Sequence, residues 1–428
     1  MYLFNARYKF NLPEIEPPFG GSIIAASGLS AVDLQRRKLK KFPHLAKRYL
    51  DPQLYMAGID EAVDAKTVSK LAAYPWFHGH AVPKYDSGQH KSAKKWKKTF
   101  DAQLAAKWTR TVCTEPSEIL RAAESAVEFQ LTLDCDVVIL PSPLTTIADQ
   151  SLQAETAWLE AGLEACEKLN VTKQIFATIA ISEDCLQSDP LKNALIHSYS
   201  NQISSRSELV GACIVLEQSD QNSYFWISRQ PLLSLLILVD DLHRGAQKQA
   251  IVNYVGTFGL VATAVGADQW SSGYYLSQRR FCRKGAPGRA HPRYHSLGLA
   301  ADIGLKADLD LLYDAGLTDK LMTPTTVDKT LRSALKAGKR TNDVAEWRYS
   351  QSNCAAAQEH YLELTSKADS DLSSKTPKQR IEWVQAWLSG AAAHAQSVKQ
   401  TVSTGSTELL HQRIWLEVFQ EWRNYAKQ

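Results

Sequence analysis

QIFATIAI, at Gln174–Ile181, is an almost unbroken apolar stretch with the length of one β-strand. A helix pattern opened by Asp189-Pro190 follows it, and a second apolar stretch, Val210–Leu216, comes next. Strands that are apolar at nearly every position are covered on both faces, which is typical of a parallel sheet. This strand–helix–strand order predicts a β-α-β unit.

Similar patterns alternate from about residue 50 to residue 275. The other strand candidates are Leu54–Ile59, Val82–Tyr85, Asp136–Leu140, Ala250–Val255 and Asp268–Ser272. Helix patterns lie between them, among them Ser117–Leu131 and Glu155–Leu169. Repeated β-α units over roughly 200 residues favour an α/β fold of the TIM-type (β/α)8 barrel class. A doubly wound open sheet is the alternative, because strand count alone does not decide closure.

The strand patterns stop at about Gly304. Beyond it, Thr376-Pro377 opens a helix pattern, and Leu409–Tyr425 carries apolar residues at helical spacing. We therefore expect two parts. Residues 1–304 are predicted to form a barrel with an N-terminal extension, and residues 305–428 a C-terminal α-helical accessory domain.

The composition is that of a folded protein. The chain has 428 residues, 44% of them hydrophobic, with a formal net charge of only +4. Its seven Cys form no CxxC pair, so we expect reduced thiols, a cytoplasmic location, no structural zinc and no cofactor. The first residues turn polar too early for a signal peptide, and the apolar run Leu232–Val239 is too short to span a membrane.

Two short motifs carry the functional signal. GADQWSSGYY, at Gly266–Tyr275, follows an apolar helix pattern, and YDSGQH, at Tyr85–His90, follows an early strand candidate. The first resembles the strand-end motif of the tRNA-guanine and archaeosine transglycosylases, which usually reads GVDLFDSAAY. The second shares its Asp-Ser-Gly with the DSGGFQ of that family. The resemblance covers about residues 50–280 and implies a TIM-type barrel that acts on N-glycosidic bonds.

The chain departs from this family in three places. Ser271 stands where the family has the Asp that attacks the sugar. Val138–Pro143 lacks the Asp with which the family reads guanine, and the three Cys and one His of the family's zinc site are also missing. The resemblance then points to the branch of similar fold that removes modified bases from phage DNA.

Loss of the nucleophilic Asp favours hydrolysis over base exchange. The N-glycosidic bond breaks through an oxocarbenium-like sugar, which a nearby carboxylate stabilises. Exchange needs a covalent sugar–enzyme intermediate, whereas hydrolysis needs only a carboxylate that activates water, for which Ser271 leaves room. Asp86 is the predicted base, because it matches the family's catalytic acid/base. Asp268 is predicted either to act near the same strand ends or to orient its loop.

Two further acids follow strand candidates, where the active sites of such barrels lie. Asp60 follows Leu54–Ile59 and is a candidate catalytic residue or a helix N-cap, and Glu217 has the same ambiguity as a substrate-binding residue. Instead of contacting a base, Trp270 could belong to the barrel core, and Gly256 could simply form a turn between a strand and a helix. The residues expected to contact the base are Ser87, Gly88, Trp270, Tyr274, Gly256, Phe258 and Glu217.

Three basic segments, 35–50, 90–100 and 278–295, contain no acidic residue. The second and third directly follow the two motifs, as the active site of an enzyme that binds a polyanion requires. We therefore expect double-stranded DNA as the partner, with no membrane and no obligatory protein partner. The predicted contacts to the DNA backbone are Lys94, Lys95, Arg279, Arg280, Arg283, Lys284, Arg289 and Arg293.

The sequence leaves three functions open. The first is a DNA glycosylase that flips out a modified base, hydrolyses its bond to the sugar and leaves an abasic site, in antiviral defence. The second is a transglycosylase that inserts a 7-deazaguanine derivative into DNA or tRNA. The third is a non-catalytic barrel that binds nucleic acid.

Overall fold

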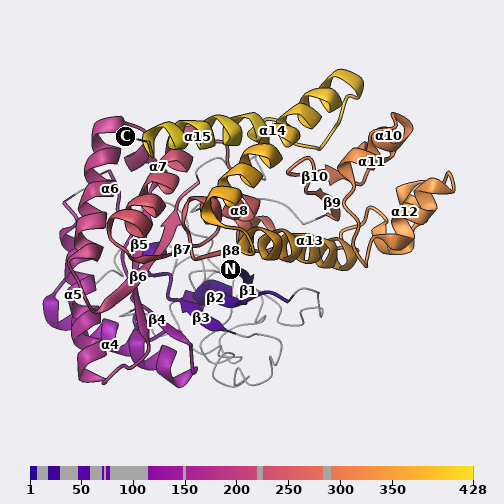
Figure 1. Ribbon diagram of the computed structural model, residues 1–428. Coiled ribbons are helices and arrows are strands. Elements are labelled where there is room, and N and C mark those ends of the chain that lie inside the picture. The colour runs from indigo at the N-terminus through magenta and orange to yellow at the C-terminus, as the bar shows by residue number, and fades with distance from the viewer. Residues whose placement is uncertain are drawn as a thin grey trace, which may run out of the picture.

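A computed structural model describes residues 1–6, 18–28, 47–57, 70–71, 74–77, 114–147, 151–218, 225–282 and 291–427. Eight parallel strands form a nearly closed barrel, in the order β3-β2-β1-β8-β7-β6-β5-β4 (Figure 1). The strands are β1 (Tyr2–Ala6), β2 (Gly21–Ala25), β3 (Arg48–Asp51), β4 (Val137–Ile139), β5 (Gln174–Ile181), β6 (Leu209–Leu216), β7 (Gln249–Val252) and β8 (Gln269–Ser272).

The two ends of the sheet meet, which distinguishes the barrel from an open doubly wound sheet. The last strand, β8, pairs in parallel with β1, so that Tyr2 lies opposite Trp270. On the other side, the amide of Asp136 at the start of β4 donates a hydrogen bond to the carbonyl of Arg48 in β3, at 2.9 Å. The prediction of a TIM-type barrel is confirmed.

The strand predictions were accurate from β4 to β8 and wrong for Leu54–Ile59. Gln174–Ile181 has the predicted bounds, and β4, β6, β7 and β8 lie within a residue or three of theirs. Leu54–Met56 forms a short 3-10 helix, and the strand lies before it, at Arg48–Asp51. Residues 2–6 and 21–25, expected in an N-terminal extension, are barrel strands. The candidate Val82–Tyr85 lies outside the described residues.

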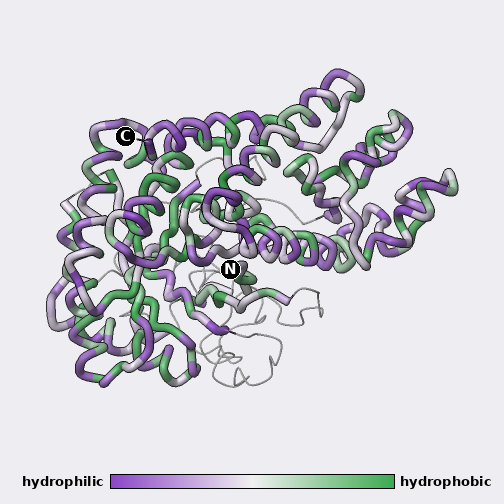
Figure 2. Tube along the Cα trace, viewed as in Figure 1, coloured by the Kyte–Doolittle hydropathy of each residue, from purple (hydrophilic) through white to green (hydrophobic). Residues whose placement is uncertain are grey.

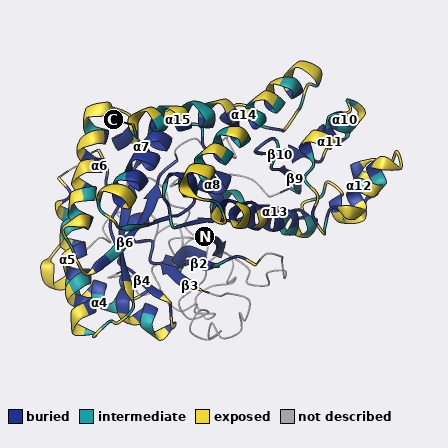
Figure 3. Cartoon of the chain, viewed as in Figure 1, coloured by how far each residue is buried: buried dark blue, intermediate teal, exposed yellow. Residues whose placement is uncertain are grey.

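Apolar side chains fill the part of the barrel interior that lies nearer the amino ends of the strands. Leu3, Ile23, Tyr49, Phe176 and Ile251, from five different strands, belong to one buried cluster. Successive residues of a strand point to opposite faces, so the neighbours of these residues point outward to the surrounding helices. Both faces of the strands are therefore covered, as their continuous apolarity predicted (Figures 2 and 3).

Helices cover the outside of the barrel. They are α4 (Pro116–Thr132), α5 (Gln153–Lys168), α6 (Asp189–Ser204), α7 (Arg229–Asp240), α8 (Gly259–Val265) and the short α9 (Leu276–Arg279). The apolar run Leu232–Val239 belongs to α7, which is buried all round because α15 packs over it. None of the described helices combines the length and apolarity needed to cross a membrane.

The C-terminal region is helical, as predicted, and no described residue after Gly304 is in a strand. Its elements are the hairpin β9 (Arg293–Ser296) and β10 (Ala301–Gly304), then α10 (Asp308–Asp314), α11 (Thr318–Leu321), α12 (Lys329–Lys336), α13 (Ala355–Ser373), α14 (Pro377–Thr401) and α15 (His411–Tyr425). In Figure 1, α10, α11 and α12 extend away from the barrel.

Helix α13 packs directly against the seam between β1 and β8. Its Asp369 accepts hydrogen bonds from the amide of Tyr2 at 2.9 Å and from Nε1 of Trp270 at 2.7 Å. Near its other end, the hydroxyls of Tyr361 and Ser272 are 2.8 Å apart. One hydrophobic core runs from the barrel into α13, α14 and α15.

Candidate functional site

A layer of polar side chains lies inside the barrel at the carboxyl ends of the strands. Four polar residues each come two positions after a residue whose side chain points into the barrel. They are Asn5 on β1, Asp51 on β3, Asn253 directly after β7 and Ser271 on β8. The alternation of strand side chains turns all four inward, one layer above the apolar cluster. All four are at most 3% exposed. Barrels of this type have their active sites at this end.

Asp51 is the centre of the layer. One carboxylate oxygen accepts hydrogen bonds from the hydroxyl of Tyr55 at 2.6 Å, from Nδ2 of Asn253 at 2.9 Å and from the hydroxyl of Tyr254 at 3.0 Å. The other accepts one from the amide of Gln53 at 3.1 Å. Four donors therefore converge on a carboxylate that has no cationic partner among the described residues.

A hydrogen-bonded chain connects this carboxylate to Ser271. The Ser271 hydroxyl donates to Oδ1 of Asn253, whose Nδ2 in turn donates to Asp51. Asn5 donates to the same Oδ1 at 3.0 Å. Ser271 therefore orients Asn253, and Asn253 directs its N–H at the carboxylate.

Burial raises the pKa of Asp51 from 3.8 to about 6, and the bonds from Tyr55, Gln53, Tyr254 and Asn253 limit the rise. A carboxyl group with this pKa is mostly ionised at neutral pH and still basic enough to accept a proton. Such perturbed values are common at catalytic sites, because a general base works best near the ambient pH.

The backbone beside Asp51 is strained. Gln53 and Tyr254 both adopt left-handed conformations, with φ of 54° and 57°, which are unfavourable for residues with a side chain. Their side chains meet, since Nε2 of Gln53 donates to the hydroxyl of Tyr254 at 2.8 Å. These conformations bring the amide of Gln53 and the hydroxyl of Tyr254 to the carboxylate of Asp51. Gly256, with φ of 58°, is also left-handed and lies in the turn after β7.

An aromatic residue packs beside this layer, beyond the strand ends. The ring of Phe281 lies 4.9 Å from that of Tyr55 and 6.3 Å from that of Tyr254. Its backbone forms a parallel bridge with Glu217 and accepts a hydrogen bond from the amide of Gln218 at 2.9 Å. Glu217 is thus buried at the end of β6, on the same side of the barrel as Asp51.

The pKa of Asp51 makes stability depend on pH in a defined window. The unfolded chain loses this proton near pH 3.8 and the folded chain near pH 6. The contribution of Asp51 to the free energy of unfolding should therefore fall by about 3 kcal/mol as pH rises through this window.

Urea unfolding of the wild type and of Asp51→Asn at pH values from 4 to 7 measures this change. We expect the difference in unfolding free energy, wild type minus variant, to fall across the window. A difference that does not vary with pH would mean that the Asp51 carboxyl titrates as an ordinary exposed one.

The structure separates the residues of the Gly266–Tyr275 motif. Asp268 lies before β8, at the amino end of the barrel, where its carboxylate accepts the amide of Ala250 at 3.0 Å. It is therefore far from the strand ends where catalysis was expected, and the loop-orienting role is the one that fits. Ser271 lies inside the barrel, near the carboxyl end of β8.

Three predicted base contacts are core residues. Trp270 is fully buried on the outer face of β8 and packs against Tyr2. Phe258 is buried against Trp415, with ring centres 5.2 Å apart. Tyr274 is 5% exposed, and its hydroxyl donates to the carbonyl of His291 at 3.1 Å. None of the three offers a free ring face on which a base could stack.

Two predicted DNA contacts are also buried. Arg279 is 3% exposed, forms an ion pair with Asp302 of β10 and lies over the ring of Tyr361 at 4.2 Å. Arg280 is 4% exposed. Both predictions are wrong, because neither side chain reaches a phosphate on the surface. Arg293 is half-buried and donates to the carbonyl of Ser406 at 2.9 Å.

The remaining predicted site residues lie outside the described part of the chain. They are Asp60, Asp86, Ser87, Gly88, Lys94, Lys95, Arg283, Lys284 and Arg289. Among the residues that the structure does describe, no group of three or more His, Cys, Asp or Glu side chains is arranged to hold a metal ion.

Asp51 is the functional candidate that sequence reasoning missed. The rule that selected Asp60, an acid directly after a strand, selects Asp51 once the strand is placed at Arg48–Asp51. The signal was present in the run Tyr49-Leu50-Asp51-Pro52, where Pro ends the strand directly after the acid.

The chain was compared with models of known protein families and with curated protein sequences, and neither comparison found a match.

Proposed function

We propose that this barrel is a DNA glycosylase that hydrolyses the N-glycosidic bond of a modified base, with Asp51 as the carboxylate that activates water. The observation that carries the proposal is Asp51 itself, a buried carboxylate at the carboxyl ends of the strands, held by four donors and with a pKa of about 6. It takes the role that was predicted for Asp86, a residue outside the described part of the chain.

In the proposed reaction the ionised carboxylate of Asp51 accepts a proton from water while the water oxygen bonds to the sugar carbon. The bond from that carbon to the base nitrogen breaks, and its electron pair leaves with the base, which takes up a proton. Asp51 then returns its proton to solvent. The negative charge of Asp51 also stabilises the positive sugar of the transition state.

The residue at position 271 favours hydrolysis over exchange. Base exchange with a covalent intermediate uses one carboxylate as nucleophile and one as acid/base. Ser271, at the position that the resemblance assigns to the nucleophile, has no carboxylate, and its hydroxyl donates to Asn253.

The choice of DNA rests on the sequence. Arg279 and Arg280 are buried, so the phosphate contacts are now assigned to the basic residues of segments 90–100 and 283–293. The modified base and the antiviral role rest on the resemblance to the hydrolytic branch of the transglycosylase-like barrels. Because Asp51 is 1% exposed, a flipped nucleotide must first displace side chains at the strand ends, such as Phe281.

Incubation with unmodified, hydroxymethylcytosine-containing and glucosylated phage DNA tests the proposal. We expect abasic sites, detected as breaks after alkaline treatment, in modified DNA and not in unmodified DNA. Parallel reactions with a labelled free 7-deazaguanine base distinguish exchange, because only exchange incorporates the label. Label incorporation would contradict hydrolysis, and binding of all three DNAs without base release would indicate a non-catalytic barrel.

A further inference from the structure

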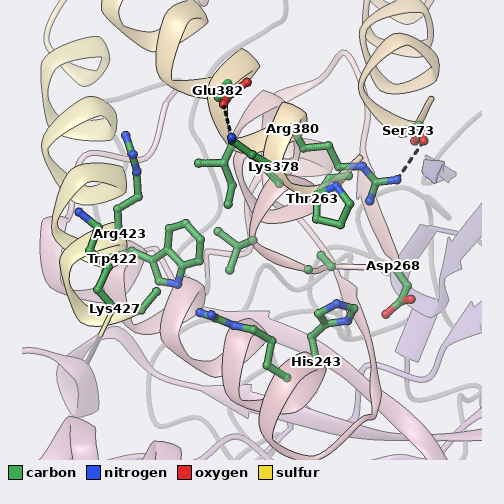
Figure 4. A pocket seen from close by; sticks show the side chains of 18 of the residues that line it. His243, Thr263, Asp268, Ser373, Lys378, Arg380, Glu382, Trp422, Arg423 and Lys427 are labelled. Atoms are coloured by element: carbon green, nitrogen blue, oxygen red, sulfur yellow. Dashed lines mark hydrogen bonds and ion pairs between the residues drawn. The ribbon is translucent and has the colours of Figure 1, made fainter. Parts of the chain in front are cut away.

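A cavity lies at the opposite end of the barrel from Asp51. Its volume is about 880 Å³, within the range of small-molecule sites (Figure 4). The end of α8, the start of α14 and the end of α15 form its walls, and Asp268 lies at its edge. The residues from Thr263 to Ala267, with Ile381 and Ala426, supply an apolar surface.

Basic side chains outnumber acidic ones in the lining of this pocket. It contains Arg244, Lys378, Arg380, Arg423 and Lys427, together with His243, against the two acids Asp268 and Glu382. The charge of Arg244 is paired with Asp240, and Lys378 lies 4.0 Å from Glu382. Among the described residues, Arg380 and Arg423 donate to neutral oxygens of Ser373, Lys375 and Gln385, so their positive charges are not compensated by these contacts.

Trp422 forms part of one wall of the pocket. The residue is 3% exposed, and its Nε1 has no hydrogen-bond partner among the described residues, as is also the case for Trp158, Trp226 and Trp347. The indole extends from α15 into the pocket (Figure 4). Phe419 stacks against it at 5.5 Å, and the guanidinium of Arg244 lies 5.9 Å from its ring centre.

The turn between α8 and β8 shapes one wall. Gly266 has φ of 139°, and a Cβ at this position would lie 2.7 Å from the ring of His243. Only glycine combines this backbone conformation with such close approach. The imidazole therefore packs on the turn at the edge of the cavity, beside the apolar surface.

We propose that this pocket binds a small phosphorylated ligand with a planar ring, of the size of a mononucleotide. The ring packs on the apolar wall beside the indole of Trp422, and the phosphate meets the uncompensated charges of α14 and α15. Arg and Lys suit phosphate, and an indole packs favourably against another planar ring. The proposal is independent of the activity proposed for the opposite end of the barrel.

Calorimetric titration of the full chain with AMP tests this site, with adenosine and inorganic phosphate as separate probes. We expect AMP to bind at least about tenfold more tightly than either, since only AMP carries both groups. Trp422→Leu, which keeps an apolar side chain and removes the aromatic ring, should weaken AMP binding about fivefold to tenfold. Arg380→Gln on α14 and Arg423→Gln on α15 should weaken it by similar factors.

Two controls make the result decisive. Arg413→Gln removes an exposed charge from α15 outside the pocket and should leave AMP binding unchanged. Asp51→Asn should leave it unchanged as well, because the two sites lie at opposite ends of the barrel. Absence of AMP binding at millimolar concentration, equal binding of adenosine, or loss of AMP binding in Asp51→Asn would each overturn the proposal. Failure of the glycosylase assay alone would not affect it.

Discussion

Asp51→Asn should lower the rate of base release by about 10²–10⁴-fold, the range of a lost general base. Asn has the shape of Asp but does not accept the proton of the attacking water, and it carries no charge to stabilise the sugar cation. The rate is measured as abasic sites formed in a single turnover on the modified DNA that the wild type cleaves best. DNA affinity, measured by fluorescence anisotropy, should change little.

Tyr55→Phe is the matched control for this variant. It removes the shortest hydrogen bond to the carboxylate, at 2.6 Å, and leaves Asp51 in place. Loss of a donor that stabilises the ionised form raises the pKa of Asp51, so the acidic limb of the pH–rate profile should move to higher pH with activity retained at pH 8. Wild-type turnover in Asp51→Asn would remove Asp51 from the reaction.

Arg279→Gln should destabilise the protein by about 3–5 kcal/mol, the usual cost of removing one partner from a buried ion pair. Although burial opposes it, the charge of Arg279, with the hydrogen bond from His295, holds the pKa of Asp302 well below its usual range. Without Arg279 this carboxylate remains buried beside His295, whose own pKa is lowered by burial. Urea unfolding at pH 7 measures the loss.

The control for Arg279→Gln is Arg413→Gln, because Arg413 is exposed and its pair with Glu417 lies on the surface of α15. That variant should lose less than about 1 kcal/mol. If Arg279→Gln proved as stable as the wild type and instead reduced the salt dependence of DNA binding, Arg279 would be a DNA contact after all.

The fold was predictable where the length, the apolar pattern and the flanking residues of a segment all indicate the same element. β5 and β6 are long, apolar at nearly every position and separated by a helix, so their pattern has one interpretation. β1 and β2 have five residues each, and β1 includes the polar Asn5, so they lack such a signal. Leu54–Ile59 is more apolar than β3, yet Pro52 and the left-handed Gln53 end the strand before it.

The candidate site was harder to predict because its contacts join residues far apart in sequence. Asp51 meets Asn253 and Tyr254 about 200 residues later, and neither looks unusual by itself. Arg279 belongs to a run of basic residues, a pattern that predicts exposed side chains. Its partner Asp302 is 23 residues later in the chain, on a hairpin that the charge pattern does not indicate. Ser271 was singled out only through the resemblance of Gly266–Tyr275 to a family motif, and not through any pattern of its own.

The pairing of β1 with β8 has a consequence for how the protein is made. Tyr2 is synthesised 268 residues before Trp270, so β1 has no strand beside it on that side until β8 has been made. At a translation rate of about 5–20 residues per second, this wait is roughly 13–54 s. Asp369, which accepts the Tyr2 amide, comes about a hundred residues later still. Throughout that interval the nascent chain exposes an apolar edge strand, a state in which chains aggregate and chaperones bind.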